Sequence, residues 1–356
     1  MRRLLGLVLF SGCMAPVGAA LDAEDIGRGG DFDLTLCGPG VSPPLTFLPA
    51  RNTIGKVALG VCGNFTSDNT STIDGEVRVR GSTRVASPVR ISGSFFTGAA
   101  VESPNTLDVE GNFATAGSWT VSAPAHVGGD ATVSGTLRHD NTVDIGGRLT
   151  AESVTGGGAL NVGSMVLAAS TVPMPLDCSG APSAHSLATE IDAHPDSRAT
   201  TTLHPDALRD IRQPTELSFG CAQYEVSELT SNNTLRLRIT GPTVLVVHGR
   251  LHIASPTFIE LEDDATLELI VDGALDIDNT LTIGDRDHPA RVVVSGDIRV
   301  ASPTRIYGVL MAPDSSIAGD NTLDVYGSMY VGAMRVAAPL VIHSGPKVGV
   351  EGWPTP

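Results

Sequence analysis

Apolar side chains alternate with polar ones in short runs along most of the chain, and the runs recur with a fixed period. Glycines are spaced 18 residues apart through the first half. When the sequence is aligned at this period, apolar residues occupy the same places after each glycine. These places hold Val77, Phe95, Phe113, Ala131 and Leu149, then Val101, Trp119 and Leu137, then Val89, Leu107, Ala125 and Val143, and last Ile91, Val109, Val127 and Ile145. Alternation predicts strands with one face turned inward, and the filled columns predict that successive rows stack.

Three short strands in each row, joined by turns, form one coil of a solenoid whose coils rise by the inter-strand distance of ~4.8 Å. Helical 3.6-residue spacing does not occur within the rows. The sequence therefore predicts an all-β fold, a right-handed parallel β-helix (β-solenoid) with about 18–24 residues per coil and one irregular, partly helical excursion.

The corners between strands follow a second pattern. VASPVRISG at 85–93 returns as VASPTRIYG at 300–308, and its Ser-Pro falls in a column that alternates between Asn-Thr and a Pro-bearing pair. Pro fixes φ, and Asn and Ser bond to nearby backbone, so both types suit turns. In the first half the corners are 69–70, 87–88, 105–106, 123–124 and 141–142, and in the second half 233–234, 255–256, 279–280, 302–303, 321–322 and 338–339. The nine-residue repeat therefore builds the wall of the solenoid.

Outward positions next to these corners form a charge ladder, which we define as Arg90, Asp108, His126 and Asp144. Basic and acidic groups alternate on neighbouring coils, and Arg305 and Asp324 repeat the scheme. Opposite charges on adjacent strands attract weakly, so the alternation is interpreted as a device that fixes coil register. The alternative is a catalytic site, because Asp108 and Asp144 are expected to lie ~9.6 Å apart, close to the spacing of the carboxylates in inverting glycosidases.

The period divides the chain. We predict a signal or lipoprotein segment at 1–20, an irregular N-terminal cap at 21–66, a first β-solenoid half at 67–167, a Pro-rich excursion at 168–218, a second β-solenoid half at 219–345 and a tail at 346–356. The excursion holds one helix-like patch, residues 184–191. Whether the two halves form one continuous stack is left open by the sequence.

The first residues have the features of an export signal. Arg2 and Arg3 precede an apolar run, 4–10, that is too short to span a bilayer as a helix. The run ends in Phe-Ser-Gly-Cys at 10–13, which resembles the lipobox of bacterial lipoproteins, although Leu is usual where Phe10 stands. The resemblance implies cleavage before Cys13 and a lipid on its sulfur. The alternative is an ordinary secretory signal cut near residues 17–20.

Five cysteines occur, and assigning Cys13 to the lipid leaves four for disulfides in an oxidising compartment. Three pairings of these four are formally open. We predict the local one, Cys37–Cys62 and Cys178–Cys221, because each pair brackets an irregular segment. No CxxC motif is present, which disfavours a zinc knuckle.

Several runs of the sequence resemble known solenoid families. The runs LSFG at 217–220, YEVS at 224–227, VLVVHGRLHIAS at 244–255 and YGVLMAPDSSIAGDNTLDVYGSMYVG at 307–332 resemble an uncharacterised solenoid domain at the C-terminal end of some type IV pilus-assembly proteins. The pilin-like membrane helix of those proteins is absent here. The 18-residue rows are similar to those of bactofilins, which polymerise end to end. The resemblance implies an envelope role with a pilus or other envelope proteins as partners.

Composition and charge narrow the functional classes. A net charge of −16 argues against nucleic acid as a partner. The acidic run Glu260, Glu262, Asp263 and Asp264 is interpreted as a solvated turn, because it lacks the ligand spacing of a calcium loop. Phosphate-loop, GxSxG and HExxH motifs are also missing. Trp119 falls in an inward column, which leaves Tyr307, Tyr326 and Tyr330 as aromatic candidates for sugar stacking.

The sequence therefore predicts a non-catalytic, rigid, lipid-anchored rod in the cell envelope, structural or adhesive, with no cofactor and no metal. It is expected to be an exported outer-membrane lipoprotein, with cell-surface polysaccharide as a further candidate partner. The alternative is a polysaccharide lyase or glycosidase acting on the outer face.

Overall fold

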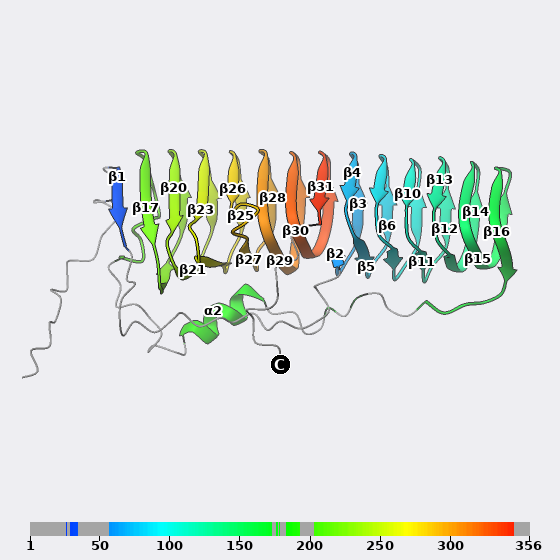
Figure 1. Ribbon diagram of the computed structural model, residues 1–356, viewed down its shortest axis with the longest axis horizontal. Helices are drawn as coiled ribbons and strands as arrows, with labels where there is room; N and C mark the ends of the chain where they lie inside the picture. The colour runs from blue at the N-terminus through cyan, green and yellow to red at the C-terminus, as the bar shows by residue number, and fades with distance from the viewer. Residues whose placement is uncertain are drawn as a thin grey trace, which may run out of the picture.

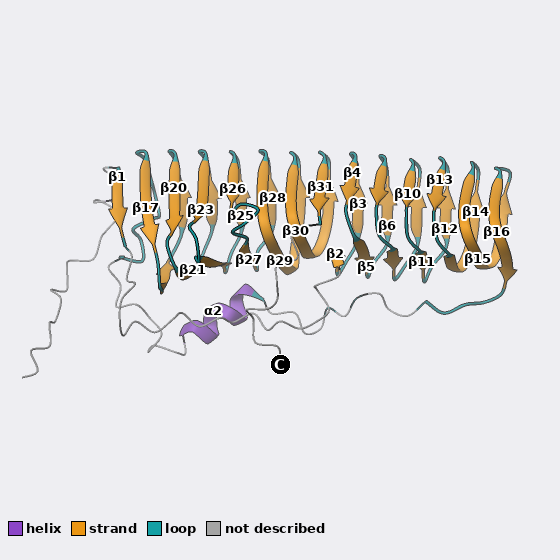
Figure 2. Cartoon of the chain, viewed as in Figure 1, coloured by secondary structure: helices purple, strands orange, loops and turns teal. Residues whose placement is uncertain are grey.

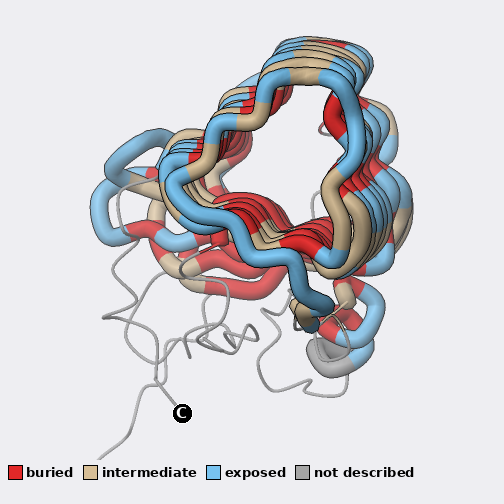
Figure 3. The backbone as a smooth tube through the Cα atoms, turned by 90° about the vertical axis from the view of Figure 1, so that its right-hand side faces the viewer, coloured by how far each residue is buried: buried red, intermediate tan, exposed pale blue. Residues whose placement is uncertain are grey.

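The computed structural model describes residues 26, 29–34, 57–172, 176, 178, 183–192 and 203–344. These residues form a parallel β-solenoid of about 14 turns, so the predicted fold class is confirmed. Figure 1 shows the rod from the side, with β1 at one end and β16 at the other. At ~4.8 Å for each turn, the rod is roughly 65 Å long. Seen along its axis in Figure 3, each coil is three-sided.

Three faces run the length of the rod, and each is a stack of parallel strands. Face 1 contains, in spatial order, β1 (Gly30–Asp33), β17 (Thr215–Phe219), β20 (Leu235–Ile239), β23 (Thr257–Leu261), β26 (Leu281–Ile283), the start of β29 (Thr304–Gly319), the start of β30 (Leu323–Val336), β31 (Leu340–His343), β4 (Ser71–Ile73), β7 (Val89–Ile91), β10 (Leu107–Val109), β13 (Ala125–Val127), β15 (Val143–Gly156) and β16 (Leu160–Leu167).

Face 2 contains β18 (Ala222–Val226), β21 (Pro242–Val247), β24 (Thr266–Val271), β27 (Ala290–Val294), the middle of β29 and β30, β2 (Val57–Val61), β5 (Glu76–Val79), β8 (Phe95–Thr97), β11 (Phe113–Thr115), β14 (Ala131–His139) and the later stretches of β15 and β16. Face 3 contains β19 (Leu229–Ser231), β22 (Leu251–Ile253), β25 (Leu275–Ile277), β28 (Ile298–Val300), the ends of β29 and β30, β3 (Phe65–Ser67), β6 (Thr83–Val85), β9 (Val101–Ser103), β12 (Trp119–Val121) and the ends of β14 and β15.

The two halves form one continuous stack, but in the reverse of their sequence order. The last strand of the second half, β31, pairs with the first face-1 strand of the first half, β4. Strands β2 and β3 pair with β30 on one side and with β5 and β6 on the other. One coil is therefore shared, because it takes face 1 from residues 340–343 and faces 2 and 3 from residues 57–67.

The corners explain how the coils hold their register. The Asn of each Asn-Thr corner donates from Nδ2 to a backbone carbonyl of the preceding coil, at 3.1–3.5 Å. Its Oδ1 accepts the backbone N–H of the following Thr. Asn69 makes this bond to Ala337, across the junction of the two halves. The alternation of Asn-Thr and Pro-bearing corners thus continues from Ala338-Pro339 to Asn69-Thr70 without interruption.

The inward columns of the alignment are the core of the rod, and all their side chains are buried. Trp119 is fully buried, packs on Phe113 with ring centroids 4.3 Å apart, and donates from Nε1 to Ser103 Oγ at 3.1 Å. The tryptophan is therefore a core residue with a satisfied N–H, as its column predicted.

Residues 168–214, which we call the return segment, lead from the β16 end back to the β17 end. They include the helix α2 (Ala184–Asp192), drawn in purple in Figure 2. Ser183 Oγ accepts the N–H of Ser186 and so caps the helix N-terminus. The helix buries Ala184, Leu187 and Ala188 against outward apolar residues of face 2, namely Val244, Val246, Ile270, Val293 and Met311.

A disulfide joins Cys62 to Cys178, with Cα atoms 5.9 Å apart, and fastens the return segment to face 2. Cys221 is also in a disulfide. Both predicted pairings, Cys37–Cys62 and Cys178–Cys221, are therefore wrong. They assumed that each irregular segment is closed locally, whereas the return segment passes beside β2 and meets a cysteine that is 116 residues away in sequence.

The strands begin and end at slightly different residues from those expected. Strand β2 and the start of β3 lie within 21–66, the range assigned to the irregular cap. They lack the regular glycine row, and the pairing of β2 with β5 shifts register between Val57 and Leu59. The return segment ends before β17 at residue 215, a few residues earlier than the sequence indicated.

The β17 end of the rod is capped. Strand β1 adds to β17 on face 1, and Leu203, Leu208 and Ile211 are buried at this end. Tyr224 is fully buried and donates from its hydroxyl to the carbonyl oxygen of Leu34 at 2.6 Å. Burial raises the pKa of the Tyr224 hydroxyl to about 12, so the group stays a donor at any physiological pH.

Tyr224→Phe should lower the free energy of unfolding by about 1–3 kcal/mol, because the buried Leu34 carbonyl loses its hydroxyl donor. Urea unfolding followed by circular dichroism measures the change. Tyr326→Phe, on the outer face, serves as the control and should change stability by less than about 0.5 kcal/mol. Equal stability of Tyr224→Phe and the wild type would contradict this role of the hydroxyl in holding the cap.

Candidate functional site on face 1

The charge ladder lies in one outward column of face 1. Asp108 is paired in register with Arg90 on one side and His126 on the other, and His126 is paired with Asp144. Because the second half stacks before the first, Arg305 and Asp324 belong to the same column, separated from Arg90 by Val341 and Thr72.

The contacts along the ladder differ from simple alternate pairing. Arg90 Nη2 lies 2.6 Å from Glu110 Oε1, whereas its Nε is 3.9 Å from Asp108 Oδ2. The hydrogen bond to Glu110 is the main reason that the pKa of Arg90 is raised. Asp144 Oδ1 accepts from Asn161 Nδ2 at 2.6 Å. Arg90 thus bonds mainly to Glu110, which follows β10, and not to the ladder residue Asp108. The ladder residue Asp144 bonds to Asn161 on the next strand.

Asp108→Lys should lower the free energy of unfolding by about 1 kcal/mol, because it places a cation between Arg90 and His126 on a solvated surface. Asp108→Asn should cost less, because it removes an attraction without adding repulsion. Thermal melts of both variants at low and high salt measure this. If the salt concentration leaves the difference between the variants unchanged, the ladder does not act through charge.

Aromatic rings form a second outward column on the same face. Tyr307, Tyr326 and His343 stack in register, with centroids 4.5 and 4.1 Å apart, and Arg286 lies over the Tyr326 ring at 5.6 Å. His343 Nε2 is 3.0 Å from Asp324 Oδ1. Because the ring faces cover one another, this stack mainly joins successive coils, and Tyr330, the other candidate, is buried on face 2.

The loop after β26 makes a small charged cluster. His288 Nδ1 lies 3.1 Å from Asp285 Oδ1, and its Nε2 lies 3.2 Å from Asp263 Oδ1. The hydrogen bond with Asp285 raises the pKa of His288. Burial alone would disfavour ionised Asp285, but the bonds from His288 and from the backbone of 287–288 outweigh it and lower the pKa of this carboxyl.

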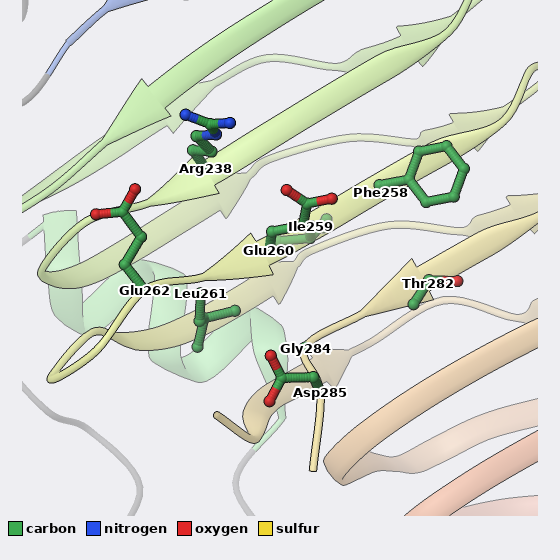
Figure 4. Close-up of a pocket in the computed structure, with 9 residues that line it drawn as sticks. All are labelled: Arg238, Phe258, Ile259, Glu260, Leu261, Glu262, Thr282, Gly284 and Asp285. Carbon is green, nitrogen blue, oxygen red and sulfur yellow. The ribbon is translucent and has the colours of Figure 1, made fainter. Parts of the chain in front are cut away.

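A shallow pocket of about 570 Å³ lies beside this loop (Figure 4). Its lining comes from β20, β23, β26 and the turns that follow them: Arg238, Phe258, Ile259, Glu260, Leu261, Glu262, Thr282, Gly284 and Asp285. Glu260 Oε1 is 3.4 Å from Arg236 Nη1, and Arg236 also lies over the Phe258 ring at 5.9 Å. The pocket therefore combines one aromatic ring with three carboxyl groups and the guanidinium of Arg238.

The structure separates the sequence-predicted residues into two groups. Glu260 and Glu262 of the acidic run line the pocket, and Asp263 reaches His288. The ladder lies several coils away, towards the β16 end. Sequence reasoning did not identify a site at Arg238, Phe258, Thr282 or Asp285. The feature of the sequence that could have indicated this site is the extra length of the coils that contain these residues. Within the described residues, no group of three His, Cys, Asp or Glu side chains is arranged to hold a metal ion.

Two predicted residues lie outside the described residues: Cys13, the lipid-attachment candidate, and Cys37. In the stretch of the chain that is described, no helix is long and apolar enough to span a membrane.

Comparison with known families gives one match. Residues 176–348 match a family described as "Domain of unknown function (DUF7305)". The matched range contains α2 and the strands from β17 to β31, which form the capped half of the rod. No curated protein and no solved structure matches the chain.

Proposed function

We propose that this chain is a non-catalytic rod of the cell envelope, exported and anchored by a lipid on Cys13, with a structural or adhesive role. The observation that carries the proposal is the continuity of the stack. Sequence-distant halves share a coil, and the return segment is fastened along face 2 by a disulfide and by α2. Such an arrangement suits a stiff spacer, because bending it would break many parallel strand pairs at once.

The Cys62–Cys178 disulfide supports export, because structural disulfides persist in oxidising compartments. The position of Ile26 indicates how the rod would be oriented. This residue is fully buried, and its carbonyl accepts the N–H of Gly29, directly before β1 at the capped end. A lipid on Cys13, a short way upstream, would therefore tether that end to the membrane. The β16 end would then point away from the membrane surface.

Pili or other envelope proteins are proposed as partners on the basis of the solenoid resemblance of residues 217–332, and cell-surface polysaccharide on the basis of the outward aromatic and charged groups of face 1.

A second candidate, a polysaccharide lyase or glycosidase, is favoured by the pocket with Phe258, Glu260 and Asp285. A glycosidase needs one carboxyl group that stays protonated as the acid. Asp285 has a lowered pKa, which favours its ionised form, and Glu260 is engaged in an ion pair with Arg236 at 3.4 Å. We therefore prefer the non-catalytic rod to the polysaccharide-active enzyme as the proposed function.

The anchor is tested by detergent phase partitioning of wild type and Cys13→Ser produced in a bacterial host. Wild type should enter the detergent phase and Cys13→Ser the aqueous phase. Equal partitioning would overturn the lipid anchor.

The choice between rod and enzyme is tested by incubating wild type and Glu260→Gln with envelope and plant polysaccharides. We expect no turnover by either protein. Turnover by wild type that is lost in Glu260→Gln would establish the second candidate in place of the first.

A further inference from the structure

The last coil of the rod exposes side chains that belong to the core. Met165 and Leu167 on β16 are paired in register with Leu149 and Ala151, which are fully buried inward residues. Yet Met165 is 48% exposed and Leu167 is 61% exposed. These are inward positions without a following coil. Figure 3 looks onto this end and shows the front coil largely exposed.

The opposite end does not share this property. The inward residues of its first coil, Leu217, Phe219 and Tyr224, are all fully buried. Strand β1, Leu34 and the residues 203–211 cover them. The two ends of the rod therefore differ: the core is covered at the β17 end and exposed at the β16 end.

The open end is also neutral. Residues 153–176 contain no Asp, Glu, Lys, Arg or His, in a chain whose net charge is −16. Proteins usually protect exposed strand edges with charged side chains, prolines or bulges, because an open edge offers unpaired N–H and C=O groups to another strand. The final coil carries no charge that would repel a second copy.

We propose that the β16 end is the interface of a symmetric dimer, in which two copies of this chain meet tail to tail. The covered β17 end blocks head-to-tail stacking, so the association closes at two copies and does not continue into a filament. A two-fold axis sets the two β16 edges antiparallel, where they exchange backbone hydrogen bonds and bury Met165 and Leu167 of both chains. The neutral coil lets two acidic chains meet without opposing charges.

Sedimentation velocity over a range of concentrations tests the dimer, with the chain carrying Cys13→Ser so that no lipid contributes. Wild type should sediment with twice the mass of one chain, and electron microscopy should show a rod of about double length. Leu167→Lys should shift the protein to a single chain, because each dimer would bury two like charges. Thr132→Lys, which adds the same charge at an outward position of face 2 on β14, should remain dimeric.

Thermal melts show whether Leu167→Lys is folded. We expect a cooperative transition whose temperature does not depend on protein concentration, whereas the dimeric wild type should melt at a higher temperature as its concentration rises. Wild type that stays single at every concentration would overturn the proposal, and so would a dimer unaffected by both Leu167→Lys and Met165→Lys. An open series of larger species would contradict closure at two copies. Association that appears only after residues 345–356 are deleted would overturn the dimer as a property of the full chain.

If the capped end is tethered as proposed above, this dimer places one anchor at each end of a doubled rod and so joins two membrane surfaces. This consequence rests on the proposed function, and a separate measurement addresses it. Vesicles that carry the lipidated wild type should aggregate, and vesicles that carry Leu167→Lys should stay apart. A dimer in solution without vesicle aggregation would count against the anchor and leave the interface standing.

Discussion

Ile342→Lys is expected to lower the free energy of unfolding by more than about 4 kcal/mol, the largest effect of any substitution considered. Ile342 is fully buried on β31, between Val325 of β30 and Ile73 of β4. The substitution removes a packed side chain and places an ammonium group in the core, at the one coil that both halves share. Urea unfolding followed by circular dichroism measures the loss.

Val341→Lys is the matched control, because it adds the same residue to the same strand one position earlier. Val341 points outward, and its register partners are Asp324 and Thr72. A lysine there can remain in water beside a carboxylate, so stability should change by less than about 0.5 kcal/mol. Similar stabilities of the two variants would mean that β31 does not lie between β30 and β4.

Cys178→Ser is expected to have the second largest effect, about 3–5 kcal/mol. The Cys62–Cys178 bond closes a loop between residues 116 apart in sequence, and chain entropy assigns about 5 kcal/mol to a loop of this length. Without the bond the unfolded chain gains freedom, and the return segment is held on face 2 by α2 and its neighbours alone. Denaturant midpoints without reductant measure the change.

Cys62→Ser should lower stability by the same amount, and the double variant should be no less stable than either single one, because each substitution removes the same bond. Additive losses in the double variant would show that the two cysteines act separately. Full stability of both single variants would contradict the bridge.

The charged and apolar outward positions illustrate how far sequence reasoning reached. The ladder column followed directly from the 18-residue period, because strand periodicity places every second residue outward. The runs VLVV at 244–247, LELIV at 267–271 and RVVV at 291–294 were a further signal. Near-continuous apolar strands are covered on both sides, and α2 does cover this region of face 2. In these strands the alternation of apolar and polar residues is lost because α2 packs on their outer side.

The pocket could not be derived in the same way. Its residues come from three coils of unequal length, and their spacing in sequence depends on the turns that follow β23 and β26. A fixed period predicts which residues share a column, but it does not predict how a longer turn folds over its neighbour. The contact of His288 with Asp263 and Asp285 is of this kind.

The sequence by itself determined the coil, its three strands, its corners and its inward columns, because each of these depends on contacts between a residue and its equivalent one coil away. Tertiary structure decided the order of the halves and the disulfide. The corner alternation fits Ala338-Pro339 followed by Asn69-Thr70, but the alignment of each half relates a coil only to its neighbours within that half. Equivalent coils can stack in either order. The ends of the halves determine the order. Strand β1 and residues 203–211 cover the core at the β17 end, and β31 pairs with β4 where the two halves meet. The return segment then brings Cys178 to Cys62.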